Sequence, residues 1–277
     1  MESFGLRLRR ALDERGPLCV GVDPHGALLR SWDVGDDIDG LRRFCDTVVA
    51  AVGDLAAVVK PQSAFFERHG SAGVAVLEST IRQFRDTGAL VLLDVKRGDI
   101  GSTASAYAQA YLDPAGPLAV DAITASPFLG FGSLRPMIDT ALANAAGVFV
   151  LALTSNPEGA SVQHARAADG RTVAQTILDE VSQVNAGMSP LGSVGVVIGA
   201  TVGAGDHDAS RLNGPVLVPG LGDQGGRPSQ LAELGQVDRA AVLPSYSREV
   251  LRAGPDVTRL RAAAVTVRDA CATPLGR

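Results

Sequence analysis

The sequence predicts an α/β fold of the (β/α)8 or TIM-barrel class, in a single domain covering residues 1–277. Eight short apolar, β-branched runs are spread along the chain, and segments with a helical pattern alternate with them. The runs lack strict alternation of polar and apolar residues, which is typical of parallel strands buried on both faces. Eight repeats in this length fit a barrel better than an open sheet of six strands, so a doubly wound sheet is the second choice.

The expected strands are Leu18–Asp23, Ala57–Lys60, Leu90–Lys96, Val120–Ser126, Val148–Leu153, Val194–Ala200, Val216–Gly220 and Ala240–Ser245. The expected helices are Leu41–Val52, Val74–Arg85, Thr103–Tyr111, Leu134–Asn144, Val173–Val184 and Val257–Ala270, with an amphipathic helix in the first 16 residues and weaker helical stretches at 206–212 and 229–235. Residues 155–170 form the longest irregular insert. Because they follow the fifth strand, and such loops lie on the catalytic face of this fold, they are a candidate lid.

Composition narrows the function classes. No apolar run approaches the roughly 20 residues of a membrane span, and the charged N-terminus lacks a signal-peptide apolar region. The three cysteines, Cys19, Cys45 and Cys271, are widely spaced, so they suggest neither a disulfide framework nor a metal site. A reducing cytoplasm is the expected location. The net charge of −5 argues against general nucleic-acid binding.

Lysine use is unusually selective. Of 25 cationic residues only two are lysines, Lys60 and Lys96, and each ends an apolar strand-like run. The placement of the two lysines could be due to chance, but a reaction that requires an amine at these positions explains it better. An arginine stays protonated at ordinary pH, whereas the pKa of a lysine responds to its surroundings.

The segment after the third expected strand is the richest in reactive groups. Strand alternation directs Asp94 and Lys96 to the same face, Asp99 follows in the loop, and Thr103 opens a helix. A structural ion pair at a strand end is the simpler interpretation. Lys60, at the end of the preceding strand, favours the functional one, because two amines and two carboxylates would then alternate at neighbouring strand ends.

A glycine-rich segment, 218–226, follows the seventh strand. Its GxGxxG pattern suggests a dinucleotide fingerprint, but it lies late in the chain and lacks the acidic ribose partner. We therefore expect a phosphate loop, in which Gly222 allows close approach of an anion. Arg248, at the end of the eighth strand, suits bidentate phosphate binding, unless it is only a helix-surface arginine.

Three further polar residues stand at strand ends. Asp23, after the first strand, is a candidate for binding a sugar hydroxyl or for capping a loop. Thr154 and Ser155, after the fifth strand, are candidates for reading a base edge or for making a turn. The four histidines show no ligand spacing.

Seven segments occur in a diagnostic order: GVDP, VVKPQSAFFE, LLDVKRGDIGST, PFLGFGSL, VIGAT, VPGLGDQGG and SREVL. Together they resemble the orotidine 5'-phosphate decarboxylase family, and most closely its longer bacterial group, often called type 2. The resemblance implies a TIM barrel, usually a homodimer, that converts orotidine 5'-phosphate to uridine 5'-phosphate and CO2 in the last step of de novo pyrimidine synthesis. It implies no metal and no cofactor.

The resemblance also implies roles for residues. Lys60, Asp94 and Lys96 would come from one subunit, whereas Asp99 and Thr103 would reach into the partner's site. Asp23 and Lys60 would contact the ribose, Ser155 or its neighbour Thr154 the pyrimidine, and Gln224 and Arg248 the phosphate. Gln62 stands where some members have histidine, as in the longer bacterial group.

Decarboxylation at C6 leaves a carbanion without a π-system to accept the charge. We expect the Lys96 ammonium to stabilise this carbanion and then to protonate it. Alternatives are a magnesium-dependent sugar-phosphate decarboxylase or aldolase, a non-catalytic nucleotide-phosphate binder and a Rossmann-type oxidoreductase. Lys60 opposes the first, because those relatives have an acidic residue at the second strand end.

Overall fold

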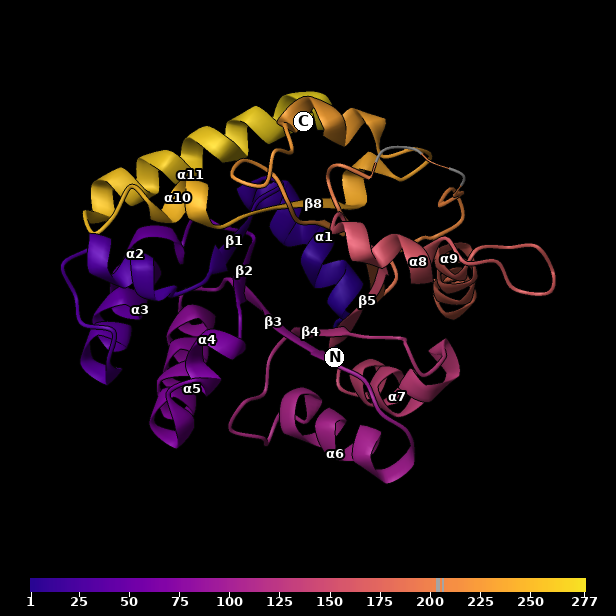
Figure 1. The fold of residues 1–277 in the computed structure, drawn as a ribbon, viewed down its shortest axis with the longest axis horizontal. Coiled ribbons are helices and arrows are strands. Elements are labelled where there is room, and N and C mark those ends of the chain that lie inside the picture. Colours follow the sequence, from indigo (N-terminus) through magenta and orange to yellow (C-terminus); the bar gives the residue numbers. More distant parts are fainter. Residues whose placement is uncertain (203–204, 206) are drawn as a thin grey trace.

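The computed structural model describes residues 1–202, 205 and 207–277. Within them, eight parallel strands pair in sequence order and close into a barrel, around which the helices form a ring (Figure 1). The strands are β1 Cys19–Val22, β2 Val58–Pro61, β3 Leu90–Arg97, β4 Ala122–Ala125, β5 Gly147–Leu153, β6 Val194–Ile198, β7 Val216–Val218 and β8 Val242–Tyr246. This confirms the (β/α)8 class over the doubly wound sheet. Each strand overlaps the run that predicted it.

The longer helices are α1 Phe4–Arg15, α3 Ile38–Val52, α5 Gly70–Asp86, α6 Gly101–Leu112, α7 Arg135–Ala143, α9 Val173–Val184 and α11 Val257–Ala272. They confirm the expected helices, with ends that differ by a few residues. Short helices that the sequence did not predict are α2 Gly26–Ser31, α4 Ala64–Glu67, α8 Ala160–Gln163 and α10 Arg248–Leu251. Short 3-10 helices occupy Phe131–Leu134, Pro157–Gly159, Pro228–Glu233, Arg239–Ala241 and Thr273–Leu275. The helical stretch expected at 229–235 is therefore a short 3-10 helix that ends at Glu233.

The helix expected at 206–212 was wrong over its described part, since residues 207–212 form turns and coil. Residue 206 lies outside the described residues. Asp208 accepts a hydrogen bond from the Ser210 N–H, and its own N–H donates to the Gln175 side chain. Such local bonds compete with helix formation, and so short a segment gains little from helix propagation.

Apolar side chains pack in two shells. Alternate strand residues fill the barrel interior with a cluster that includes Leu90, Leu92, Phe149 and Leu243. The intervening residues face the helices and form the larger outer cluster. All five β6 residues are buried, for example, so the absence of polar alternation has its expected cause.

Helix α1 closes the N-terminal end of the barrel, seen in Figure 1 behind the strands. Its buried face carries Phe4, Leu8 and Leu12, which join the interior cluster. The Phe4 ring meets Phe149 edge-on, with 6.1 Å between ring centroids. A Cβ at Gly147 would lie 2.4 Å from the Phe4 ring, so only glycine leaves room for this closure.

The insert after β5 is less irregular than expected. It contains the Pro157–Gly159 turn and α8, and Arg166 and Thr172 form an antiparallel bridge. Whether it acts as a lid stays a prediction. In the described part of the chain, none of the helices has the length and apolar character needed to cross a membrane.

Candidate active site

Polar side chains replace apolar ones at the carboxyl ends of three adjacent strands. Lys60 on β2, Asp94 on β3 and Thr124 on β4 are 7%, 6% and 1% exposed. Each lies two residues beyond an apolar interior residue of its own strand, so strand alternation directs it into the barrel mouth. The sequence pattern therefore places one amine, one carboxylate and one hydroxyl at the top of the packed interior.

Asp94 is the centre of this group. Its Oδ2 accepts hydrogen bonds from Lys60 Nζ at 3.1 Å and from Gln62 Nε2 at 3.0 Å. Its Oδ1 accepts from Lys96 Nζ at 2.6 Å and from the Thr124 hydroxyl at 2.7 Å. The Lys96 side chain is 47% exposed, whereas that of Lys60 is 9% exposed. One ammonium is therefore buried beneath the carboxylate, and the other faces the open mouth.

The backbone at Lys96 is bent. Its φ of +45° is one that a non-glycine residue rarely adopts, and the β3–β4 register shifts between Leu93 and Arg97. The Lys96 N–H donates to the Thr124 hydroxyl at 2.9 Å. Alternation alone therefore does not place this side chain. Thr124 fixes both the backbone of Lys96 and one oxygen of Asp94.

Burial and neighbouring charges shift the pKa values of Lys60 and Asp94 in opposite directions. Burial alone would lower the pKa of Lys60, but the carboxylates of Asp94 and Asp23 outweigh it and raise that pKa. Burial would raise the pKa of Asp94, but the Lys60 and Lys96 ammonium groups lower it well below its usual range. Both groups are therefore charged over the whole neutral range.

A small pocket of about 80 Å³ lies beside Lys60, between the loops after β7 and β8. Asp23, Gln224, Ser247 and Arg248 line it. Asp23 Oδ1 and Ser247 Oγ are buried there and have no hydrogen-bond partner in the described part of the protein. Buried polar atoms normally have partners, so these two atoms are suited to a polar ligand.

Arg248 meets a carboxylate in this pocket. Its Nε lies 3.5 Å from Asp223 Oδ2, and Arg252 pairs with the other oxygen of the same carboxylate. The Arg248 side chain is 42% exposed. Most of its donors are thus accessible from the mouth, as expected for an anion-binding arginine.

The glycine-rich loop closes on itself. The N–H of Gly222, at a φ of +71°, donates to the Gly226 carbonyl at 2.8 Å. Gly222 therefore shapes the loop, and its own N–H is already used. A Cβ at Gly220 would lie 3.4 Å from Gln224 Oε1 and 3.6 Å from Ser155 Oγ. This glycine lets side chains from two different loops converge.

The two residues after β5 differ in their surroundings. The Thr154 N–H and hydroxyl both bond to the Gln163 side chain, at 2.9 and 2.6 Å, and the hydroxyl also donates to Asn156. The Ser155 side chain lies toward Gly220 and has no hydrogen-bond partner among the described residues. Thr154 thus anchors the insert, while Ser155 is available at the mouth.

Asp99 and Thr103 lie apart from the Asp94 group. In the described part of the chain Asp99 forms no ion pair, and its carboxylate accepts only the neighbouring Ile100 N–H at 2.8 Å. Thr103 is exposed on α6. Of the residues singled out from the sequence, the structure gathers Lys60, Asp94 and Lys96 in one network and Asp23, Gln224 and Arg248 around the adjoining pocket.

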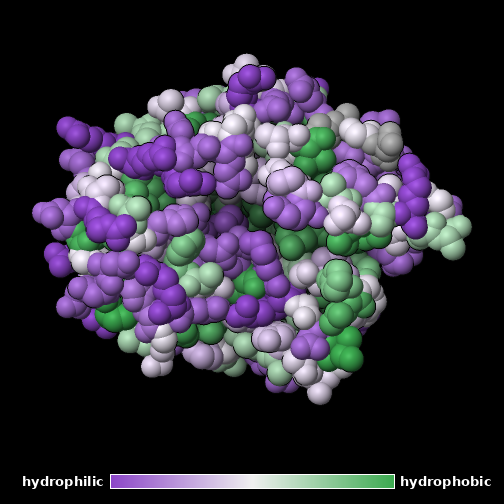
Figure 2. Space-filling model, in the orientation of Figure 1, coloured by the Kyte–Doolittle hydropathy of each residue, from purple (hydrophilic) through white to green (hydrophobic). Residues whose placement is uncertain are grey.

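Sequence reasoning did not assign Thr124, Gln62 or Ser247 to the site. Thr124 had a usable signal, because it is a polar residue near the end of an otherwise apolar strand-like run. Gln62 and Ser247 lie in the diagnostic segments VVKPQSAFFE and SREVL, but nothing in those segments showed what their side chains would contact. Figure 2 shows a hollow near the centre of this face of the molecule, with hydrophilic residues around it.

A closed β/α barrel that buries a charged network at the carboxyl ends of its strands belongs to the class of TIM-barrel enzymes. Residues 16–263 match the model of the orotidine 5'-phosphate decarboxylase / HUMPS family. The chain belongs to this family.

Relatives that align over nearly the whole chain belong to the same family. An orotidine 5'-phosphate decarboxylase of Salinispora arenicola is 66% identical over 275 residues, with 99% of each chain covered. That of Streptomyces coelicolor is 57% identical over 264 residues, with 95% of each covered. A Streptomyces avermitilis crystal structure, provisionally named an orotidine 5'-phosphate decarboxylase, has a TM-score of 0.97 at 54% identity, covering 100% of this chain and 97% of that one. The family expected from the motifs is therefore confirmed.

Proposed function

We propose that this protein decarboxylates orotidine 5'-phosphate to uridine 5'-phosphate and CO2, the last step of de novo UMP synthesis. The family and its full-length relatives support this activity. The observation that carries it is the Asp94 carboxylate held between two ammonium groups at the mouth, next to an arginine-lined pocket. Lys60 at the β2 end, bonded to Asp94, also favours this reaction over that of a magnesium-dependent relative.

In the proposed mechanism Lys96 lies beside C6 of the pyrimidine. The C6–carboxylate bond breaks, CO2 leaves, and the electron pair stays on C6 next to the Lys96 ammonium. A proton then passes from Lys96 Nζ to C6. Preorganised charge is the main source of such stabilisation, and here the hydrogen bonds of Asp94 hold the charges in place before substrate arrives. The two lysines supply the positive charge, so the proposal needs no metal and no cofactor.

The remaining site residues would bind the rest of the substrate. Asp23 and Lys60 would contact the ribose, and the unpaired Asp23 Oδ1 supports this. Ser155 is the better candidate for the pyrimidine, since the Thr154 hydroxyl is engaged in the insert. Gln224 and Arg248 would bind the phosphate, with Gly222 shaping the loop beneath it.

The direct test follows the loss of orotidine 5'-phosphate ultraviolet absorbance after adding protein that has been treated with a chelator. We expect full turnover under these conditions. Activity that disappears with chelator and returns with magnesium would favour the metal-dependent alternative. No turnover in either condition would leave only binding of nucleotide phosphates.

We also propose a homodimer with shared active sites, in which Asp99 and Thr103 complete the partner's site. The absence of an ion pair for Asp99 in the described chain supports this. So does an exposed apolar patch in the neighbouring loops, formed by Ile100, Phe128 and Leu129 at 63%, 77% and 54% exposure. Figure 2 shows hydrophobic side chains gathered over this side of the mouth, near α7.

Mixing the inactive variants Asp99→Ala and Lys96→Ala tests the dimer. A mixed dimer holds one site with both native residues, so activity should recover to about a quarter of the wild-type value after subunit exchange. Continued inactivity of the mixture, with exchange shown independently, would contradict the shared site.

Two coarser features complete the proposal. Residues 1–277 would form a single domain, because the C-terminal Arg277 reaches back to the Leu12 carbonyl of α1 at 3.0 Å. The protein would act in the cytoplasm on a small-molecule substrate, without nucleic acid or membrane. Its three cysteines are buried and unpaired, which suits a reducing compartment.

A further inference from the structure

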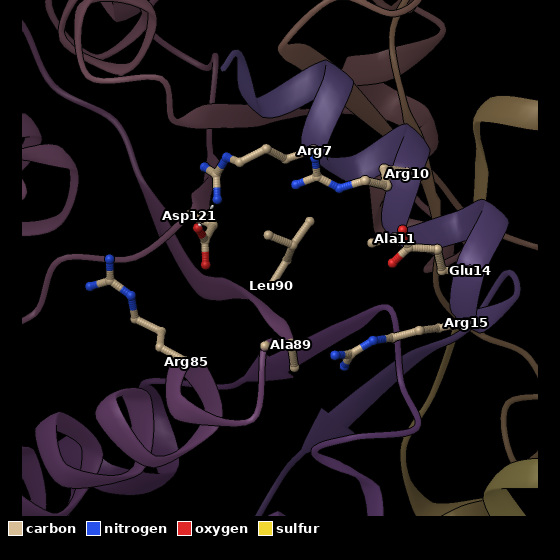
Figure 3. A pocket seen from close by; sticks show the side chains of 10 residues that line it. Arg7, Arg10, Ala11, Glu14, Arg15, Arg85, Ala89, Leu90 and Asp121 are labelled. Atoms are coloured by element: carbon tan, nitrogen blue, oxygen red, sulfur yellow. Dashed lines mark hydrogen bonds and ion pairs between the residues drawn. The ribbon is translucent and has the colours of Figure 1, made fainter. Parts of the chain in front are cut away.

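The end of the barrel opposite the mouth carries a second polar pocket, of about 320 Å³, which we call the base pocket. It lies between α1, the C-terminal end of α5 and the start of β3 (Figure 3). Four arginines and two carboxylates line it, namely Arg7, Arg10, Arg15, Arg85, Glu14 and Asp121. The ionisable side chains of this pocket therefore have a net positive charge.

Two of the arginines already serve the fold. Arg7 donates to Asp121 Oδ1 at 2.5 Å and to the Ala145 carbonyl at 2.8 Å. Arg15 donates to the carbonyls of Gly53, Ala56 and Thr87 at 3.0–3.2 Å. These bonds join α1 to the loops at the base of the barrel. Their charges remain in the pocket, but most of their directional donors are used.

The other two arginines keep most of their donors. Among the residues that the structure describes, Arg85 makes one bond, at 3.3 Å to the Ala119 carbonyl, and Arg10 pairs only with the Glu2 carboxylate, at 2.9 Å. Both side chains line the pocket: Arg10 extends over Leu90 from α1, and Arg85 lies on the other side of Leu90, on the side of Asp121 (Figure 3). A guanidinium has five N–H donors, so each can still offer a two-pronged face to an anion.

The carboxylates neutralise only part of this charge. Asp121 is buried, and both of its oxygens are occupied, one by Arg7 and the other by the Val91 N–H at 2.9 Å. It balances Arg7 and is unavailable to the others. Glu14 is exposed and can balance one more arginine at most, and Glu2 outside the pocket balances Arg10, so four arginines face three carboxylates.

We propose that the base pocket binds a small anion with two or three phosphoryl groups, held mainly by Arg10 and Arg85. Planar carboxylates satisfy one guanidinium face, whereas linked tetrahedral phosphoryl groups present oxygens to both walls at once. A neighbouring pocket of about 270 Å³ shares Arg7, Arg85 and Asp121 and is lined further on by Leu112 and Val120. An organic group attached to the phosphates has room there. The proposal is independent of the decarboxylase activity.

Calorimetric titration of tripolyphosphate into the protein tests the proposal. The Arg248→Ala variant is used as the parent, so that tripolyphosphate does not bind at the mouth. We expect one site per chain, weakened at least about tenfold by Arg85→Gln and by Arg10→Gln. Glu14→Gln should increase the affinity several-fold. A misfolded variant would lose affinity, so an increase cannot be explained by misfolding. Arg82→Gln, which removes an arginine of α5 that is paired with Glu78 outside the pocket, is the matched control and should bind as the parent does.

Two results would overturn the proposal. One is an affinity that Arg85→Gln, Arg10→Gln and Glu14→Gln all leave unchanged. The other is citrate binding as tightly as tripolyphosphate, because the pocket would then select charge alone and not phosphoryl groups.

Discussion

The mouth and the base of the barrel both contain charged side chains, but these side chains have different roles. At the mouth, Lys60 and Lys96 converge on one carboxylate, and beside them lie a buried oxygen and a hydroxyl that have no partner among the described residues. At the base, Arg7 and Arg15 bind mostly backbone carbonyls and fasten α1 to the barrel. The difference lies in which donors are already used. N–H donors that are already hydrogen-bonded within the protein stabilise the fold, whereas donors that remain accessible can bind ligands.

The largest expected effect separates the mouth from the base. Lys96→Ala should lower kcat by at least about 10⁴-fold, because it removes both the positive charge beside C6 and the proton donor. Binding of uridine 5'-phosphate, measured by calorimetry, should persist. Near-normal turnover in this variant would refute the role given to Lys96.

A smaller loss is expected from Arg248→Ala. It should lower kcat/KM by about 100-fold, because the phosphate loses a charge-assisted partner while the Asp94 network is unchanged. With a truncated nucleoside substrate, added phosphite should activate the wild type and not this variant. Equal activation of both proteins would show that phosphate binding does not depend on Arg248.

At the base, removing an arginine should lower the stability of the fold. Arg7→Met leaves the buried Asp121 carboxylate without its guanidinium, at a cost of about 3 kcal/mol in the free energy of unfolding. Urea denaturation measures this, and Arg82→Gln on the surface of α5 serves as the comparison. A loss below about 1 kcal/mol, the range of exposed pairs, would mean that the base is not held in this way.

Thr124→Val tests how far the mouth depends on a neutral group. The change leaves the Lys96 N–H and one Asp94 oxygen without the hydroxyl, so kcat should fall about tenfold. Thr124→Ser keeps the hydroxyl and should restore most of that loss. If serine and valine gave equal losses, packing and not hydrogen bonding would explain the effect.

The smallest expected effect is in the pH dependence of stability. Because the pKa of Asp94 is lowered on folding, its contribution is present above its unfolded pKa of about 3.9 and is lost as pH falls further. The pKa of Lys60 is raised, so its contribution is present below its unfolded value of about 10.4 and is lost as pH rises through the folded value. The difference in unfolding free energy between wild type and Asp94→Asn should stay constant from about pH 5 to 9 and shrink below about pH 4. A difference that changed near neutrality would contradict these shifts.

Much of this architecture could be predicted from the sequence, because strand burial and helix periodicity are local signals. The segment with Asp94 and Lys96 was recognisable because it carries several charged groups at the end of one apolar strand. The bonds that Thr124 and Gln62 make to Asp94 were not predicted, because they depend on the register of neighbouring strands, although Thr124 stood out as a polar residue in an apolar run. The left-handed backbone at Lys96 was equally hidden, because a bulge between β3 and β4 produces it.

The base pocket shows a second limit. Its arginines come from α1 and from the end of α5, about 70 residues apart in the chain, and each looks like an ordinary surface charge on its own helix. Only closure of the barrel brings them together. Sequence reasoning identified the mouth because strand ends of a barrel converge by rule, and no comparable rule applies to the base.

The carboxylate of Asp223 changes what substrate binding means at Arg248. This arginine already has an anionic neighbour at 3.5 Å, so under the proposed function a phosphate would compete with that carboxylate for its charge. Arg252 holds the other Asp223 oxygen, and the displaced carboxylate therefore keeps a counterion throughout. The affinity for phosphate would then be a difference between two competing attractions, and Asp223→Asn should strengthen phosphate binding and slow product release.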